Sequence, residues 1–120
     1  MRSIEQTAIL LAAILNRSKQ TRARVSAKTI KILGRRKHLR RAFVAELTDA
    51  LAEYYWILFE IDSGGYGAVQ TKTLEAAKPV TAKRWLLDEE RRDLKRDKTE
   101  VWSALEKEAT PEEEHADDDE

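Results

Sequence analysis

The stretch that decides the fold is residues 55–73, which read YWILFEIDSGGYGAVQTKT. Its first seven residues are mainly β-branched and aromatic, a composition that favours a strand. Residues 62–67 are a strong turn signal because of their glycines, and residues 68–73 alternate in the manner of a returning strand. The stretch therefore predicts a β-hairpin. Strand alternation places Trp56 and Leu58 on the face opposite Ile57, Phe59 and Ile61.

Charge is distributed unevenly along the chain. Residues 17–41 contain eleven Lys or Arg and no Asp or Glu. Residues 1–45 carry twelve basic and one acidic side chain, a net charge of +11, whereas residues 46–120 carry ten basic and twenty-one acidic side chains, a net charge of −11. A half-chain this basic needs either a polyanion or the chain's own acidic half to offset its self-repulsion. Nucleic acid is the polyanion that such a surface most often meets.

Two helices are predicted before the basic run ends. Ser3 and Gln6 form a possible capping box for a largely buried helix that ends near Asn16. Residues 17–24 are expected to be a polar connection. Ser26 is a good N-cap and Gly34 a good C′ residue, so a short helix is predicted over residues 27–33.

A third helix is predicted from about residue 37 to residue 53. Its first turns are basic and its later turns are acidic, with Glu46, Asp49 and Glu53. This order opposes the helix dipole, which favours acidic residues first and basic residues last. One reason for such an order is that the basic start of the helix faces an anionic partner.

The remainder of the chain is highly charged. Residues 74–80 are predicted to be a connection, and residues 81–109 a long helix. The last stretch, 110–120, has seven acidic residues and no large apolar one, so it is predicted to be disordered. The domain assignment is thus 1–80, 81–109 and 110–120.

Three helices followed by a hairpin with a glycine-rich tip resemble a winged helix-turn-helix DNA-binding domain, over residues 3–73. The resemblance implies a mainly α fold with a small β-hairpin, to which the C-terminal helix and acidic tail are added. It implies a double-stranded DNA partner, with the third helix in the major groove and the hairpin wing on the backbone or in the minor groove. The candidate DNA-binding residues are then Arg24, Lys28, Lys31, Arg35, Arg36, Lys37, His38, Arg40, Arg41, Tyr66 and Lys72.

The function indicated first is a small DNA-binding transcriptional regulator, dimeric through residues 81–105, because two half-sites are usually read by two subunits. The alternative is a protein–protein interaction module, such as an accessory subunit of a nucleoprotein complex or a phage-type inhibitor, since fold does not fix function. An RNA-binding role is a weaker third hypothesis. The acidic tail has two interpretations of equal weight, competition with DNA for the basic face and a contribution to solubility alone.

Other classes have little support in the sequence. The chain has no cysteine, so it has neither a disulfide framework nor a thiolate metal site. No catalytic constellation or metal-ligand spacing is evident, and the sequence predicts a non-enzymatic protein without cofactor or metal. The glycines of residues 64–67 indicate a tight turn rather than a phosphate loop. No apolar run is long enough to span a bilayer, and a cytoplasmic protein without membrane contact is expected.

Overall fold

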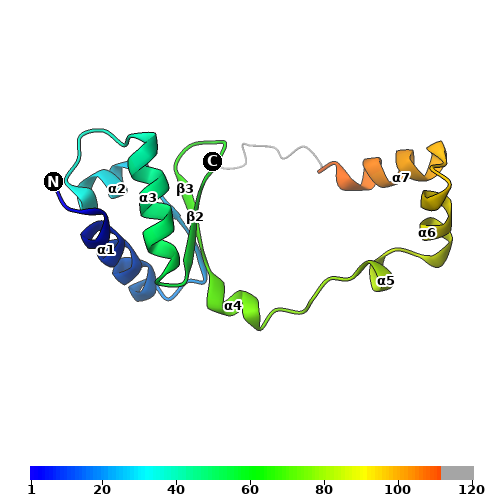
Figure 1. Cartoon of the computed structure of the whole chain (residues 1–120), viewed down its shortest axis with the longest axis horizontal. Helices are drawn as coiled ribbons and strands as arrows, with labels where there is room; N and C mark the ends of the chain where they lie inside the picture. Colours follow the sequence, from blue (N-terminus) through cyan, green and yellow to red (C-terminus); the bar gives the residue numbers. More distant parts are fainter. Residues whose placement is uncertain (112–120) are drawn as a thin grey trace. The chain divides into compact units, whose positions relative to one another are not determined.

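A computed structural model describes residues 1–111 and divides the chain into two compact units, Met1–Ala77 and a second that begins at Lys78. The described part is mainly helical with a small antiparallel sheet (Figure 1). The elements of the first unit are, in order, α1 (Ile4–Arg17), β1 (Arg22–Val25), α2 (Ala27–Gly34), α3 (Arg41–Ala52), β2 (Trp56–Glu60), β3 (Tyr66–Gln70) and α4 (Thr71–Glu75).

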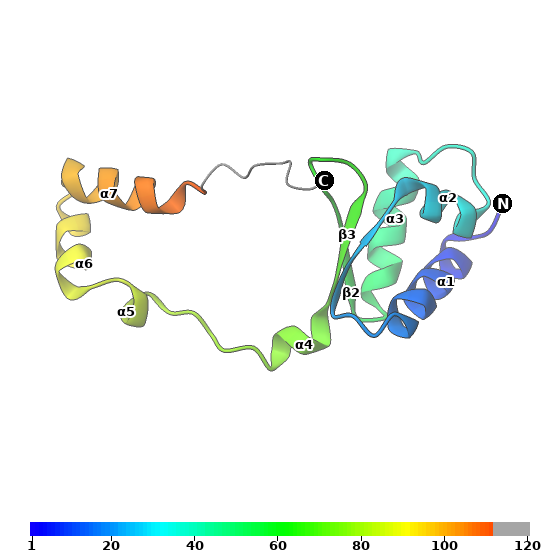
Figure 2. The same ribbon diagram turned by 180° about the vertical axis from the view of Figure 1, so that it is seen from behind.

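The sheet has three antiparallel strands in the order β1-β3-β2, so β3 is central. Helices α1, α2 and α3 all lie on one side of it (Figures 1 and 2). The side chains that face these helices form a single core, which includes Leu11 of α1, Ile30 of α2 and Leu47 of α3. The opposite face of the sheet carries no helix of this unit.

The first helix begins and ends close to the predicted residues. The Ser3 hydroxyl accepts the Gln6 backbone N–H at 3.1 Å, and the Gln6 side chain accepts the Ser3 N–H at 3.0 Å, so the predicted capping box is confirmed. This exchange satisfies two of the N–H groups that a helix start leaves free. The helix ends at Arg17, one residue after the predicted position.

Trp56 at the start of β2 is the largest fully buried side chain, with 0 % of its surface exposed. Its indole N–H donates to the Asn16 side-chain oxygen at 3.0 Å, so the polar atom of the ring is satisfied near the end of α1. Leu58 points the same way and is also buried, whereas Ile57 and Phe59 on the other face are 43 % and 46 % exposed. The predicted alternation of this strand is confirmed.

Strand β1 was not predicted, since residues 17–24 were expected to be a connection. Lys19 has a φ of 62°, which reverses the chain after α1, and Arg22–Val25 then pairs with Tyr66–Val69 of β3. Ala23 and Val25 face the core, while Arg22 and Arg24 are exposed. The four residues Arg22–Val25 do alternate charged and apolar side chains, but so short an alternation inside a long basic run does not stand out as a strand.

The hairpin is confirmed, but its returning strand is Tyr66–Gln70 rather than the expected residues 68–73. The turn is closed by the Ile61 N–H, which donates to the Gly65 carbonyl at 3.1 Å. Gly64 and Gly65 have φ values of 112° and 82°, a region that glycine enters at little cost. Tyr66 is therefore not an exposed residue at the tip. It is the first residue of β3 and is only 8 % exposed.

The third helix begins at Arg41 rather than at residue 37, so the expectation that Lys37, His38 and Arg40 form its first turns is wrong. Helix α2 includes Gly34, and Arg35, with a φ of 53°, takes the left-handed cap position predicted for Gly34. The Arg36 N–H then donates to the Lys31 carbonyl at 2.9 Å and turns the chain into a loop. Leu39 packs against the core from this loop. It lies four residues before the buried Phe43, a spacing that suggests a helix although the chain is not helical at Leu39.

The second unit contains three short helices in its described part, not the single long helix predicted over 81–109. They are α5 (Ala82–Trp85), α6 (Asp88–Lys95) and α7 (Thr99–Ala109). Leu86 and Leu87 are extended between α5 and α6, and Asp97 has a φ of 52° between α6 and α7. The acidic tail predicted to be disordered lies outside the described residues except for Thr110 and Pro111. Within residues 1–111, no helix combines the length and hydropathy needed to cross a membrane.

Candidate nucleic-acid interface

The basic run of residues 17–41 follows a continuous path from the end of α1 through β1, α2 and the 36–40 loop to the start of α3. Most of its cationic side chains are exposed. The ion pairs found in residues 1–111 are Arg91–Asp88 and Lys98–Asp93, both in the second unit. Among the described residues, therefore, no carboxylate forms an ion pair with any of the eleven basic side chains of this run.

Helix α2 contributes Lys28 and Lys31 to this run, and Arg35 follows at its C-cap. Ser26 caps the helix by accepting the Thr29 N–H at 3.1 Å, and Ile30 points into the core. Lys28, Lys31 and Arg35 lie three and four residues apart, which places them on one side of the helix. Lys28 and Arg35 are exposed and Lys31 is half-buried.

The 36–40 loop adds three exposed candidates, Lys37, His38 and Arg40, beside Arg41 at the first position of α3. The loop, the start of α3 and the hairpin turn lie at the same end of the first unit in both views of the ribbon (Figures 1 and 2). The backbone near Gly65 also approaches the start of α2, since a Cβ on Gly65 would lie 3.3 Å from the Val25 carbonyl oxygen. The fold thus gathers the candidates of α2 and the loop near one end.

Arg24 does not lie on helix α2 with Lys28 and Lys31. It belongs to β1, where strand alternation turns it to the outer face of the sheet opposite Gly67. Arg22 occupies the same face opposite Val69.

Arg36 has a structural position. Its guanidinium lies 3.7 Å from the centre of the Phe43 ring and donates to the Arg2 carbonyl at 3.2 Å. Arg2 in turn donates from its side chain to the Leu33 carbonyl at 2.9 Å, at the C-terminus of α2. The two arginines tie the chain start to the end of α2, where cations are favoured. Arg36 is half-buried by these contacts.

We expect Arg36→Ala to lower the free energy of unfolding by about 1–3 kcal/mol, because it removes a cation–π contact, a hydrogen bond and the packing of a long side chain. Arg35→Ala is the matched control, since Arg35 is exposed and makes no such contact. Urea unfolding of both variants measures the difference. Equal stability of the two would show that Arg36 is an ordinary surface residue.

Tyr66 belongs to the wall of a groove, not to a wing surface. The groove lies between the start of α3 and the hairpin and is lined by Leu39, Arg41, Val44, Ala45, Glu60 and Tyr66. Burial raises the pKa of the Tyr66 phenol above its usual range, and the nearby Glu60 carboxylate raises this pKa further.

The raised pKa of Tyr66 predicts that the folded protein loses stability at alkaline pH. The unfolded chain releases the phenol proton at a lower pH than the folded chain, so the stabilisation is complete below the usual tyrosine pKa of about 10 and is lost as the pH rises through the folded value. Urea unfolding between about pH 8 and about pH 11 measures the loss. Tyr66→Phe should flatten this part of the profile, and a decline as steep as in the wild type would contradict the assignment.

Lys72, predicted to lie in or near the wing, is on α4. Its ammonium group lies 4.7 Å from the centre of the Tyr55 ring, at the end of the hairpin remote from the turn. The predicted wing therefore has no basic side chain of its own between residues 61 and 71.

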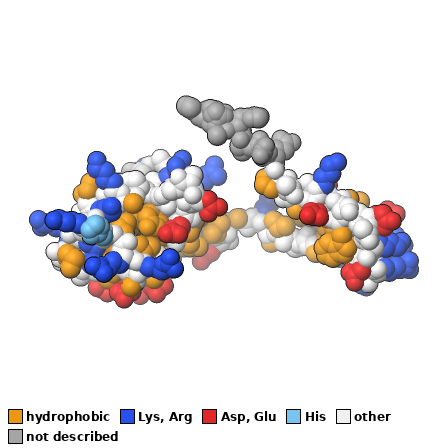
Figure 3. All heavy atoms as spheres, turned by 90° about the horizontal axis from the view of Figure 1, so that it is seen from above, with side chains coloured by type: hydrophobic (Ala, Val, Ile, Leu, Met, Phe, Trp, Pro, Cys, Tyr) orange, Lys and Arg blue, Asp and Glu red, His pale blue; other side chains and the backbone are white. Residues whose placement is uncertain are grey.

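The exposed side of α3 is acidic. Glu46 and Asp49 of α3 and its C-cap residue Glu53 join Glu5 of α1 along a groove between the two helices. In the view of Figure 3, Lys and Arg side chains lie around several parts of the outline of the first unit, and Asp and Glu side chains lie beside some of them. These carboxylates would repel phosphate from the middle and the end of α3. An anion therefore suits only Arg41, at the start of the helix, and the loop that precedes it.

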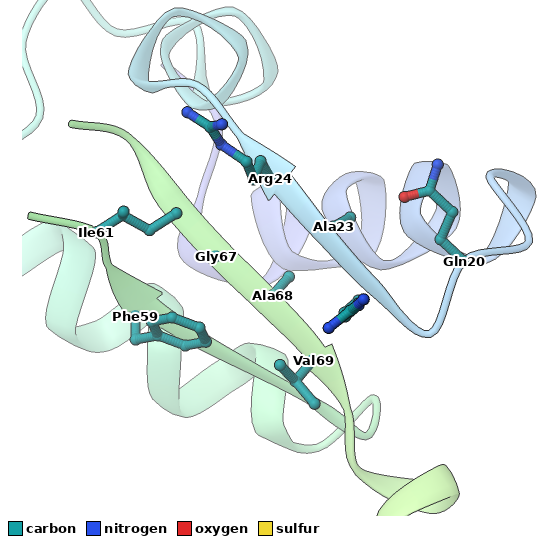
Figure 4. A pocket seen from close by; sticks show the side chains of 9 residues that line it. Gln20, Ala23, Arg24, Phe59, Ile61, Gly67, Ala68 and Val69 are labelled. Carbon is teal, nitrogen blue, oxygen red and sulfur yellow. The ribbon is translucent and has the colours of Figure 1, made fainter. Parts of the chain in front are cut away.

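The structure has a hollow of about 630 Å³ on the outer face of the sheet, which was not predicted as a site (Figure 4). It is lined by Gln20, Arg22, Ala23, Arg24, Phe59, Ile61, Gly67, Ala68 and Val69. The sequence predicts that residues 57, 59 and 61 share one face of a strand, and this face forms the apolar side of the hollow. The cationic side comes from Arg22 and Arg24 of β1, a strand that was not predicted. Residues 1–111 contain no cluster of three or more His, Cys, Asp or Glu side chains placed to hold a metal ion.

Comparison with known proteins identifies no relative. No protein-family model matches the chain, and no curated protein or solved structure matches it.

Proposed function

We propose that the Met1–Ala77 unit is a winged helix-turn-helix domain that binds double-stranded DNA mainly through phosphate contacts, and that the protein is a small DNA-binding regulator. The order α1-β1-α2-α3-β2-β3, with the sheet order β1-β3-β2, supports the first part of the proposal. It is the arrangement expected of a three-helix domain whose last two strands form a wing.

The observation that carries the proposal is the unpaired charge of the basic run. Exposed Lys28, Arg35, Lys37, Arg40 and Arg41 follow one another along α2, the loop and the start of α3, with no carboxylate partner among the described residues. Condensed counterions are released when such a surface meets the phosphates of a duplex, and this release favours binding. Surfaces that serve solubility alone normally mix the two signs of charge.

The acidic side of α3 shapes the mode of binding. Base reading by the body of this helix would require Glu46 and Asp49 to enter the groove past the phosphates. We therefore assign the phosphate contacts to α2 and the loop. Any contact with a base edge by α3 is assigned to Arg41, the first residue of that helix.

A binding isotherm with a labelled duplex of about 20 base pairs, repeated across a salt series, tests the proposal. Four or five phosphate contacts give a slope of log affinity against log salt of about −4. Absence of binding at low salt, or an affinity that does not depend on salt, would contradict it.

A protein–protein interaction module remains the second candidate. The acidic groove between α1 and α3 favours it, because Glu5, Glu46, Asp49 and Glu53 present a surface suited to a cationic protein rather than to DNA. Chemical cross-linking to duplex DNA distinguishes the two candidates, since only a DNA-binding domain cross-links through α2 and the loop.

A further inference from the structure

The outer face of the sheet is ordered in two rows across the strands. One row is Arg22, Val69 and Ile57, and the next is Arg24, Gly67 and Phe59. Both rows run from a cation on the edge strand β1 to a large apolar side chain on the other edge strand, β2. Ile57 is 43 % exposed and Phe59 is 46 % exposed. Two large apolar side chains exposed next to each other on one sheet face are more than scattered surface residues, and such patches mark interaction sites.

Gly67, in the middle strand β3, leaves space on this face for the ring of Phe59. A Cβ on Gly67 would lie 2.5 Å from Cζ of Phe59 and 2.7 Å from its Cε2. The distal part of the ring therefore lies over the glycine, so the ring leans from β2 across β3 (Figure 4). Between the ring, Ile61 and Val69 on one side and β1 on the other lies the hollow of about 630 Å³.

Both charged side chains that line the hollow are cationic. Arg22 and Arg24 are both exposed, and none of the nine residues that line the hollow is acidic. No ion pair within residues 1–111 involves either arginine. An occupant that covers Ile57 and Phe59 would bring its opposite edge over β1, where a carboxylate forms a charge-assisted pair and a cation is repelled.

We propose that this face binds an amphipathic helix of a partner protein, with its apolar side on Ile57 and Phe59 and its carboxylates on Arg22 and Arg24. The spacing fits a helix laid along the strands. Residues two apart on a strand are about 6.6 Å apart, and residues four apart on a helix are about 6 Å apart along its axis. The matching helix carries acidic residues at i and i+4, beside large apolar residues also four apart. This is the helix-in-groove mode of recognition, and it does not depend on DNA binding by α2.

Single-stranded nucleic acid is the competing occupant, because it also has anionic groups and flat apolar surfaces. Strand-binding surfaces offer several aromatic rings for successive bases. Here Phe59 is the single aromatic among the lining residues, and the others that are apolar are aliphatic. A face of this composition suits leucine and isoleucine side chains better than stacked bases.

The experiment uses the full chain and two labelled helical peptides of about 15 residues. One peptide has Glu at i and i+4 beside Leu pairs at the same spacing, and the other has Gln in place of both Glu. We expect the Glu peptide to bind about tenfold more tightly than the Gln peptide, since it forms two additional charge-assisted pairs. Arg22→Gln with Arg24→Gln should remove this preference, so that both peptides bind alike. A Phe59→Ser variant should weaken both peptides.

The matched control is Lys28→Gln with Lys31→Gln, which removes two charges from α2 and leaves the outer sheet face intact. Peptide binding by this variant should equal that of the wild type, whereas its affinity for duplex DNA should fall if α2 contacts phosphates. Equal affinity of the wild type for both peptides, or no binding of either, would overturn the proposal. Tighter binding of a labelled twelve-residue oligothymidylate through Arg22, Arg24 and Phe59 would also overturn it and assign the face to single strands.

Discussion

Replacing Trp56 with alanine lowers the free energy of unfolding of the first unit by about 3–5 kcal/mol, the largest stability effect expected for any single substitution here. The side chain is fully buried between the sheet and the helices, so its removal leaves a cavity that the core cannot fill. The change also leaves the Asn16 amide without the indole N–H that it now accepts. Small domains have a total stability of only about 5–15 kcal/mol, so much of it would be lost.

Chemical denaturation followed by far-ultraviolet circular dichroism measures this loss. Trp102→Ala is the matched control, because Trp102 is 53 % exposed and its loss should change stability by less than about 1 kcal/mol. Trp56→Phe gives an intermediate value, since it keeps most of the apolar volume and loses the hydrogen bond. If Trp56→Ala unfolded at the same denaturant concentration as Trp102→Ala, the core described here would be wrong.

The second large effect concerns DNA. Lys28→Gln, Arg35→Gln and Arg40→Gln together should reduce the affinity for a duplex by about two to three orders of magnitude at about 0.1 M salt, because each phosphate contact contributes about 0.9 to the slope of log affinity against log salt. The same three changes should make the slope less negative by about 2.7. Affinity and slope are both read from anisotropy of a labelled duplex.

Lys83→Gln, Arg84→Gln and Arg92→Gln form the control. These three residues are exposed in the second unit, so the control changes the net charge by the same amount. Its affinity for the duplex should stay within a few-fold of the wild type. An equal loss in both triple variants would mean that binding depends on net charge rather than on the surface of α2 and the loop.

The parts of the fold that the sequence predicts are those with local signals. The capping box at Ser3, the cap at Ser26 and the hairpin follow from residue types at fixed spacings, and all three are present. Strand β1 is held by pairing with β3, more than forty residues away, and its own alternation extends over only four residues. Long-range pairing of this kind is not visible in a short window of sequence.

The sequence names the charged residues that are candidates for the site, but it assigns several of them to the wrong element or role. Leu39 has the right spacing for a helix with Phe43, yet it reaches the core from a loop, so Lys37, His38 and Arg40 precede α3. Arg36 was counted with the phosphate contacts, but a cation that can stack on a buried ring is used in packing. Charge indicates which partner a surface suits, whereas tertiary packing decides which of the charged groups remain free.

The most direct test of the central claim is a map of backbone amide signals by nuclear magnetic resonance as duplex DNA is added at low salt. The account predicts that the signals that move lie in α2, residues 35–41 and the hairpin turn, and that those of Glu46, Asp49 and Glu53 stay in place. Signal changes centred on the exposed side of α3, or confined to residues 78–111, would contradict it.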